Sequence, residues 1–192
     1  MSTDHELITA AMAGDRAAMD SLLRAHHDRV YVVCRRITGN DADAADATQE
    51  ALIAIVRGLG RFDGRSSFST WVYRVATNAS LDELRRRKRR PTLVIDDDLA
   101  GHESADHQGA ARIDGLGDRM AIDEALRMLP EDFRVPLVLR DVCDLDYADI
   151  AATLDIPIGT VKSRIARGRG ALAQILRAGN QIDPDDRPTT AP

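Results

Sequence analysis

The chain has 192 residues, of which 44% are hydrophobic, 30% charged and 4% aromatic, and its formal net charge is −5. This composition is typical of one or two globular domains with aliphatic cores, and it argues against a large β-sandwich. The acidic total disfavours nucleic-acid binding only as an average, because acids and bases are segregated along the chain. Two cysteines, Cys34 and Cys143, are too few for a disulfide scaffold, and each lies in an apolar run where an inert buried thiol is expected.

Apolar residues recur at helical spacing and nowhere alternate as in a strand, so the expected fold class is all-α with two small helical domains. The first domain is expected over residues 1–90. Its caps and breaks predict a helix from Asp4 to Ala13, a second beginning at Gly14-Asp15, a third over 28–38 that Gly39-Asn40 ends, and a fourth over 42–57 capped by Asp41.

The helix expected over residues 42–57 has two distinct faces. An apolar stripe predicts the face that packs on the core: Ala44, Ala45, Ala51, Leu52, Ile55, Val56 and, beyond it, Leu59. The opposite face is polar and mostly acidic: Asp43, Asp46, Gln49, Glu50, Ile53 and Arg57. One interpretation is a solvated acidic face. The other is a polar-rimmed docking surface, since Ile53 is an apolar residue ringed by charges.

A turn-rich loop over residues 61–67 precedes the next helix, which Ser66 or Ser67 is expected to cap. The buried stripe of this helix is predicted to be Phe68, Trp71, Val72, Val75, Ala76 and Ala79. Its end is a run of six cations, residues 85–90, with no acid among them. Like charges at this spacing destabilise a helix unless a polyanion offsets them. The run therefore favours nucleic acid, and a membrane is disfavoured because there is no apolar face beside it.

Residues 91–118 are expected to form a flexible acidic linker, and residues 178–192 a disordered tail. The linker has seven acids, one base and four glycines, and such a composition buries too little apolar area to order itself. The tail contains Pro184, Pro188 and Pro192.

The second domain is expected over residues 119–177, with helices over 119–129, from Pro130 to about 142, over 147–154 and from about 159 to 177. Asp146 is expected to cap the third of these, and Asp155-Ile156-Pro157 to form a tight turn. A short helix, a brief turn and a longer basic helix are typical of a helix-turn-helix.

The longer helix of this unit is the expected DNA reader. Ile150, Ala151, Leu154 and Ile156 are predicted to pack against Val161, Ile165 and Leu172, which leaves a basic face exposed. Arg suits guanine edges, and Ser and Thr suit bases or phosphates. An ordinary hairpin with a basic solvent face is the alternative. The candidate DNA-binding residues of this face are Thr160, Lys162, Ser163, Arg164, Arg167 and Arg169.

Three stretches together resemble the extracytoplasmic-function sigma factors, the smallest class of the sigma-70 family. Residues 46–50, reading DATQE, are similar to that family's polymerase-docking helix. Residues 62–90, reading FDGRSSFSTWVYRVATNASLDELRRRKRR, are similar to its minus-ten segment, and residues 145–172, reading LDYADIAATLDIPIGTVKSRIARGRGAL, to its minus-thirty-five helix-turn-helix. Gly168 and Gly170 depart from the family's better helix formers, and they predict a soft C-terminal half of the reading helix.

The resemblance implies a role for each of these segments. The clamp helices of core RNA polymerase would meet Asp43, Asp46, Gln49, Glu50 and Ile53. A base flipped from the non-template strand would enter the loop of Asp63, Ser66, Ser67 and Phe68, and the melted minus-ten element would be held by Asn78, Asp82, Arg85 and Arg86. The resemblance also implies promoter DNA and an anti-sigma factor as partners, a stress or envelope response and a monomeric free state. The residues themselves predict no cofactor and no metal. The polar N-terminus and the longest apolar run, residues 51–56, predict no membrane insertion and a cytoplasmic location.

Two other functions are possible from the residues alone. A stand-alone helix-turn-helix regulator would explain residues 119–177, but it leaves the docking face and the run at 85–90 without purpose. An enzyme would need a phosphate loop, zinc-ligand spacing or a nucleophile motif, and the sequence shows none of them. His26-His27 and Cys34 lack metal-site spacing, so the histidines are expected to be a surface pair.

Overall fold

The computed structural model describes residues 4–89 and 113–179, with side chains described from Met120 onward in the second range. These residues form helices and no strands, so the predicted all-α class is confirmed. None of the helices in the two ranges has the length and hydropathy needed to cross a membrane. The elements are α1 (Asp4–Met12), α2 (Arg16–Thr38), α3 (Asp41–Gly58), the short 3-10 helix η1 (Leu59–Arg61), α4 (Phe68–Arg89), α5 (Ile113–Met128), α6 (Glu131–Asp141), α7 (Tyr147–Leu154) and α8 (Ile158–Gly179).

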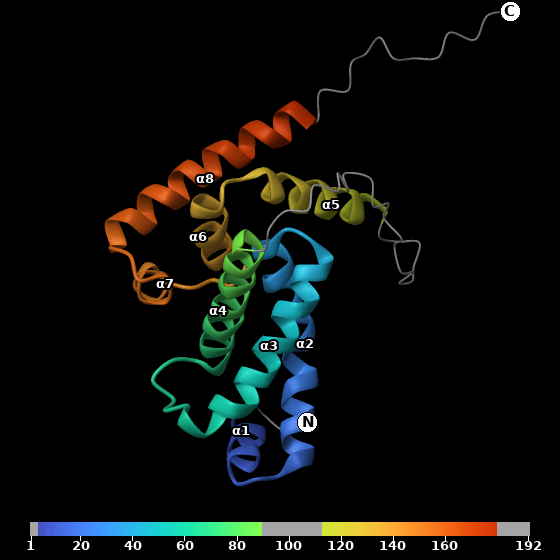
Figure 1. Ribbon diagram of the computed structural model, residues 1–192, viewed down its shortest axis with the longest axis vertical. Coiled ribbons are helices and arrows are strands. Elements are labelled where there is room, and N and C mark those ends of the chain that lie inside the picture. Colours follow the sequence, from blue (N-terminus) through green and yellow to red (C-terminus); the bar gives the residue numbers. More distant parts are fainter. Residues whose placement is uncertain (1–3, 90–112, 180–192) are drawn as a thin grey trace, which may run out of the picture.

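The first domain is a bundle in which α2, α3 and α4 pack against one another and α1 closes the far end (Figure 1). The prediction of a break near residue 28 was wrong, because α2 is one continuous helix of 23 residues. Asp15 begins it, since its side chain accepts hydrogen bonds from the amides of Ala17 and Ala18. Gly39 ends it in the left-handed conformation, with φ 84°.

The helix that carries the acidic face, α3, is capped by Asn40 and not by Asp41. The Asn40 side-chain oxygen accepts a hydrogen bond from the amide of Asp43 at 2.8 Å. Most of the predicted stripe faces the core, but Ala45 is exposed and Val56 is 44% exposed. Ala47 and Thr48 are buried in their place. The core-facing side of α3 is thus rotated slightly from the one that the apolar residues alone suggested.

His26 is a core residue, so the prediction of a surface histidine pair holds only for His27. His26 is 4% exposed as a residue, and its ring centroid lies 5.0 Å from that of Phe68 in an edge-on contact. Its Nε2 atom lies 3.4 Å from a carboxylate oxygen of Asp4. Burial lowers the pKa of His26 below 6.5, and the charge of Arg29 lowers it further, while Asp4 opposes the shift.

Acidification from about pH 7 to about pH 5 is therefore expected to lower the free energy of unfolding. The unfolded chain takes up a proton near pH 6.5, whereas the folded chain does so only at a lower pH. The stability that neutral His26 contributes is fully present above pH 6.5, the unfolded pKa. It is lost as the pH falls from there toward the lower pKa of the folded chain. Urea unfolding across this range measures the slope. We expect His26→Leu to flatten it and His27→Leu to leave it unchanged; equal slopes in both variants would contradict this.

The second domain consists of α5 to α8, with α8 packed on α5, α6 and α7. Its first helix begins at Ile113, six residues before the predicted start at 119 and so within the segment expected to be linker. Its last helix continues to Gly179, past the predicted end at 177. The rest of the expected linker and tail, residues 90–112 and 180–192, lies outside the described residues.

Gly168 lets α8 approach α6 closely. It is buried, and a Cβ atom there would lie 3.2 Å from the backbone oxygen of Phe133. Gly170, two residues on, has nothing within 4 Å of the same position. The two glycines, which the sequence grouped together as weak helix formers, thus differ in packing.

This difference predicts opposite effects of alanine at the two positions. Gly170→Ala is expected to raise the free energy of unfolding by up to about 1 kcal/mol, since alanine is the better helix former. Gly168→Ala gains the same preference but crowds a backbone carbonyl, so we expect a net loss of about 1 kcal/mol. Thermal or urea unfolding of both variants measures the two signs, and a stabilised Gly168→Ala protein would be the contrary result.

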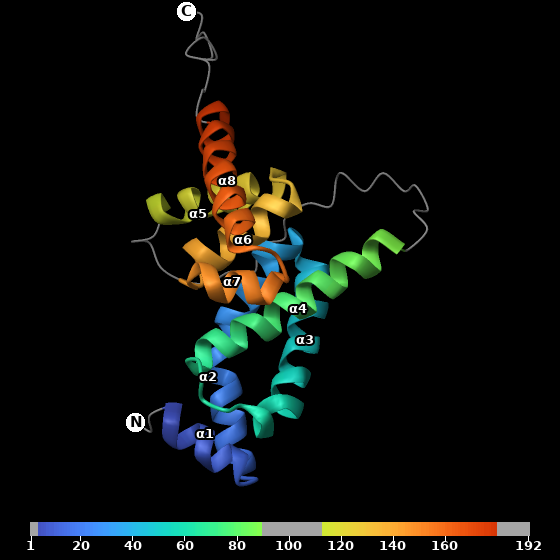
Figure 2. The same ribbon diagram turned by 90° about the vertical axis from the view of Figure 1, so that its left-hand side faces the viewer.

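The two domains, which were expected to be joined only by a flexible linker, lie in direct contact (Figure 2). Helix α2 packs against α5 and α6, and α4 against α7. Among the described residues, three ion pairs cross the boundary: Arg36–Asp123 at 2.9 Å, Arg74–Asp149, and Lys88–Glu131 at 2.6 Å. Sequence reasoning missed this contact, because its partners lie far apart in the chain.

Both cysteines are buried free thiols, as their apolar surroundings predicted. Burial raises the pKa of Cys34, and it raises that of Cys143 to about 12. A thiol with so high a pKa is almost entirely protonated near neutral pH and is a poor nucleophile. No cluster of three metal-binding side chains occurs within residues 4–89 and 113–179.

Candidate nucleic-acid interface

Helices α7 and α8 form the helix-turn-helix that the sequence predicts. Asp146 caps α7 by accepting a hydrogen bond from the amide of Asp149 at 2.7 Å. Asp155 takes the left-handed conformation at the turn, with φ 52°. Ile150 on α7 and Val161 and Ile165 on α8 are buried between the two helices. The packing fixes the crossing of the helices and leaves one face of α8 in solvent.

The exposed face of α8 carries the predicted DNA-binding side chains, but they are not equally available. Arg164 is half-buried and pairs with Asp132 at 3.1 Å, while Arg169 pairs with Asp141. The Lys162 ammonium lies 5.6 Å from the centre of the Tyr147 ring. Arg167 is exposed and forms no ion pair within the described residues. Thr160 is half-buried, and Ser163 is exposed and donates a hydrogen bond to the Thr160 carbonyl.

The basic end of α4 has acidic partners that the sequence did not reveal. Each of the cations at 85–88 reaches a carboxylate: Arg85–Asp82 at 2.8 Å, Arg86–Glu83, Arg87–Asp43 at 3.2 Å and Lys88–Glu131 at 2.6 Å. The expectation that only a polyanion could offset this run is therefore corrected. The guanidinium groups of Arg85 and Arg86 nevertheless remain accessible, with 63% and 45% of their side chains exposed.

Glu83 is a residue that sequence reasoning missed. Its side chain is 1% exposed, and it pairs with Arg86 one turn further along α4. Removing Arg86 would leave this carboxylate buried without its partner, which destabilises a fold. A loss of DNA binding in an Arg86 variant can therefore be interpreted only together with a measurement of that variant's stability.

Of the four residues predicted to contact a flipped base in the loop before α4, three are exposed or half-buried. Asp63 is exposed and accepts a hydrogen bond from the Arg65 amide, and Ser66 is half-buried. Ser67 caps α4 by accepting from the Thr70 amide at 3.0 Å. Phe68 is 7% exposed and packs against Phe62 and Trp71, so it belongs to the core. Its inclusion among the base-contacting residues is corrected to a supporting position beneath the loop.

On α4 itself, Asn78 and Asp82 are exposed one turn apart, upstream of Arg85 and Arg86. Phe68, Val72 and Ala76 are buried on the other side of the helix, as predicted, whereas Trp71, Val75 and Ala79 are half-buried. Helix α4 therefore offers one polar and basic face that begins near the loop and ends at its cationic C-terminus.

The candidate protein-docking face on α3 is smaller than the sequence suggested. Asp46, Gln49 and Glu50 are exposed. Ile53 is half-buried between them and the core. Asp43 accepts a hydrogen bond from the Asn40 side chain at 2.7 Å and pairs with Arg87, and its side chain is only 15% exposed. The carboxylate of Asp43 is thus already engaged in contacts within the domain.

Comparison with known proteins identifies both domains. Residues 22–90 match the Sigma-70 region 2 family, and residues 119–172 match Sigma-70, region 4. The ECF RNA polymerase sigma factor SigM of Mycobacterium tuberculosis (strain ATCC 25618 / H37Rv) is 37% identical over 91% of this chain and 85% of its own length. The ECF RNA polymerase sigma-E factor of Escherichia coli (strain K12) is 36% identical over 88% of this chain and 92% of its own length.

Solved structures share the fold. The sigma factor RpoE of Bartonella quintana, in complex with the anti-sigma factor NepR, has a TM-score of 0.63 at 23% identity over 82% of this chain and 96% of that one. CnrH, in complex with the cytosolic domain of CnrY, has a TM-score of 0.60 at 22% identity over 91% and 97%. Two family matches in this order, relatives along most of the chain and this helical fold agree, and the chain therefore belongs to the ECF RNA polymerase sigma factors, which are non-enzymatic transcription initiation factors.

Proposed function

We propose that this sigma factor divides its contacts among three surfaces, one for core RNA polymerase and two for promoter DNA. The observation that carries the proposal is the exposure of α8 beside a capped turn, with Arg167 free of ion pairs within the described residues. An arginine placed so can donate two hydrogen bonds to a guanine edge in the major groove. In this proposal α8 binds the minus-thirty-five element through Thr160, Lys162, Ser163, Arg164, Arg167 and Arg169.

The second DNA surface is the loop before α4 together with the polar face of α4. Asp63, Ser66 and Ser67 would receive a flipped base, with Phe68 supporting the loop from below. Asn78, Asp82, Arg85 and Arg86 would hold the strand of the melted minus-ten element. Cationic contacts to the backbone can offset an unstacking cost of a few kcal/mol per base.

The third surface is the acidic face of α3, which would bind the clamp helices of the largest polymerase subunit. Asp46, Gln49 and Glu50 supply a polar rim, and Ile53 supplies the apolar centre that an interface of this kind needs. Asp43 would contribute only if it released Arg87.

The division of the chain fits this scheme. We propose residues 1–90 as the domain for the core and the minus-ten element, residues 119–177 as the domain for the minus-thirty-five element, residues 91–118 as the flexible linker and residues 178–192 as the tail. Helix α5 takes residues 113–118 from that linker, and α8 takes Ala178 and Gly179 from that tail. The free chain would be a cytoplasmic monomer, since polymerase and chromosome lie there.

We further propose control by an anti-sigma factor in a stress or envelope response. One solved structure with this fold, the sigma factor RpoE of Bartonella quintana, is a complex with the anti-sigma factor NepR. Such a partner would act by covering the α3 face or the two DNA surfaces.

Gel filtration of the purified chain mixed with core polymerase tests the proposal against a stand-alone regulator. We expect the chain to elute with polymerase, and a promoter fork with an unpaired minus-ten segment to join the complex. A regulator that works alone would elute apart from polymerase and bind duplex DNA without it.

A further inference from the structure

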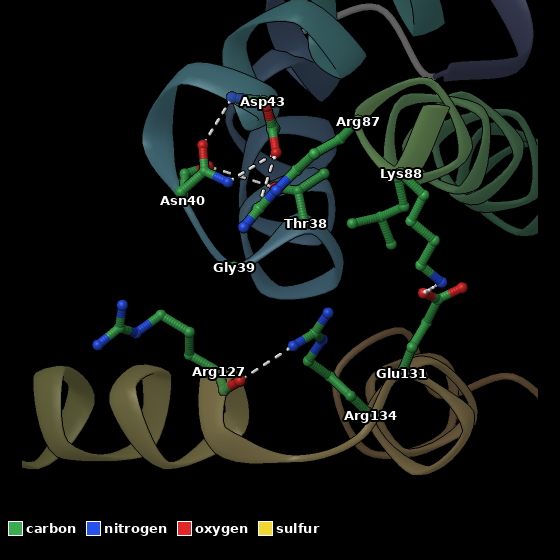
Figure 3. Close-up of a pocket in the computed structure, with 10 residues that line it drawn as sticks. Thr38, Gly39, Asn40, Asp43, Arg87, Lys88, Arg127, Glu131 and Arg134 are labelled. Carbon is green, nitrogen blue, oxygen red and sulfur yellow. Dashed lines mark hydrogen bonds and ion pairs between the residues drawn. The ribbon is translucent and has the colours of Figure 1, made fainter. Parts of the chain in front are cut away.

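A polar cavity of about 580 Å³ lies at the boundary between the two domains. One wall is the turn from α2 to α3 and the end of α4, and the other wall is the end of α5 and the start of α6 (Figure 3). Its volume lies in the range of small-molecule sites. Of the residues proposed above for polymerase and DNA, Asp43 alone lines this cavity.

The lining of this cavity has more positive than negative charge. Arg87, Lys88, Arg127 and Arg134 line it together with only two carboxylates, Asp43 and Glu131. Arg87 pairs with Asp43 and Lys88 with Glu131, so each carboxylate already has a cation. Arg127 pairs with Glu124, which is outside the cavity.

Arg134 is the most unusual of these cations, because it is only 8% exposed. Its Nη1 group donates to the carbonyls of Arg127 at 3.1 Å and Leu129 at 3.4 Å, which closes the end of α5. Its Nε group is buried without a partner among the described residues. Burial lowers the pKa of Arg134, the charge of Glu131 opposes the shift, and the charge of Arg87 adds to it. Glu131, the nearby carboxylate, pairs with Lys88, and Arg134 itself forms no ion pair within the described residues. A buried guanidinium without a direct carboxylate partner is costly, and a bound anion would offset the cost.

We propose that this interdomain cavity binds a small phosphate-bearing anion of the pyrophosphate type, held by Arg134 and Arg87 with Lys88 at the rim. Guanidinium groups suit phosphate oxygens because each can donate two parallel hydrogen bonds. In Figure 3 the Arg134 guanidinium projects toward the first domain, and the Arg87 guanidinium lies against Asp43 on the α2–α3 turn, so both line the cavity from opposite domains. The ligand has to be small, because the two domains approach each other closely at the edge of the cavity. At Gly39, a Cβ atom would already lie 3.3 Å from Arg127 of the opposite domain.

A ligand here would bind the two domains together, since its contacts come from α4 on one side and α6 on the other. It would favour the closed arrangement over one in which the domains separate. This consequence rests on the proposed function: promoter elements some 25 base pairs apart are roughly 85 Å apart along the duplex, at about 3.4 Å per pair. The anion would then oppose promoter binding.

Isothermal titration calorimetry of the full chain with inorganic pyrophosphate tests the site without polymerase or promoter, so its failure is distinct from a failure of the proposed function. We expect one site per chain. Arg134→Met and Arg87→Met should each raise the dissociation constant at least tenfold. Arg24→Met is the matched control, because Arg24 is an exposed, paired arginine on α2 some 14 residues from Thr38, roughly 21 Å along the helix.

The proposal is overturned if no saturable heat appears, or if the three variants bind like the parent, which would indicate diffuse cationic attraction. Should circular dichroism show that Arg134→Met does not fold, Arg87→Met decides, since 61% of the Arg87 side chain is exposed and Asp43 keeps its hydrogen bond from Asn40. A parallel titration with guanosine diphosphate separates two sources of the same chemistry. If guanosine diphosphate binds more tightly than pyrophosphate, the site is assigned to nucleotides. If it binds equally or more weakly, the site is assigned to inorganic phosphates.

Discussion

Replacing Ile53 with glutamate is expected to remove binding to core RNA polymerase. Ile53 is a large apolar side chain beside Asp46, Gln49 and Glu50 on α3, and it is half-buried against the domain, while Val56 one turn further on is 44% exposed. A carboxylate at the centre of an apolar contact would lose its hydration without gaining a partner. Centres of interfaces carry most of the binding energy, so the loss should be at least about 2 kcal/mol, roughly 30-fold in affinity.

The control for this variant is Ala17→Glu, which adds the same charge at an exposed position near the start of α2. It should bind polymerase like the parent, because an acid in the first turn of a helix is tolerated. Thermal unfolding of both variants checks that the half-buried position has not cost the fold. A folded Ile53→Glu protein with the parent's affinity for core would show that α3 is not the docking surface.

Replacing Arg167 with alanine is expected to weaken binding to a minus-thirty-five duplex by roughly 1–3 kcal/mol. Arg167 is the cleaner test among the basic residues of α8, because Arg164 and Arg169 also pair with acids of α6. Changing either of those would leave Asp132 or Asp141 without its partner. Arg177→Ala removes an exposed charge near the far end of the same helix, and it is the matched control.

Two duplexes separate the possible contacts of Arg167. A contact to a base edge would make the loss larger on the promoter duplex than on a scrambled one of equal length. A contact to phosphate would lower both affinities alike and reduce the slope of log affinity against log salt by about 1. Fluorescence anisotropy measures the affinity for each duplex and its dependence on salt. An unchanged affinity on both duplexes would remove Arg167 from the interface.

Short-range signals in the sequence predicted much of the fold. The cap at Asp146, the helix end at Gly39 and the turn at Asp155 were correct, and Ser67 is one of the two caps expected for α4, since each of these depends on a few neighbouring residues. Errors occurred where weak local signals competed. The His26-His27 stretch was read as exposed, although the ring of His26 completes an aromatic cluster with Phe68.

The candidate sites were predictable in outline and not in detail. Sequence patterning located the acidic face of α3, the basic end of α4 and the reading helix α8. It could not show that Lys88, Arg164 and Arg169 have partners, because Glu131, Asp132 and Asp141 are distant in the sequence. Asp82 and Glu83, the partners of Arg85 and Arg86, lie three residues before them and could have been found. Sequence patterning could not find Arg134, whose importance depends on a cavity that two domains form together.

Promoter-specific run-off transcription with purified core polymerase tests the central claim most directly. We expect a transcript of defined length when the chain, core polymerase and a promoter from the same genome are combined, and none when the chain is omitted or carries Ile53→Glu. A chain that binds duplex DNA yet supports no initiation at any promoter of that genome would contradict the account.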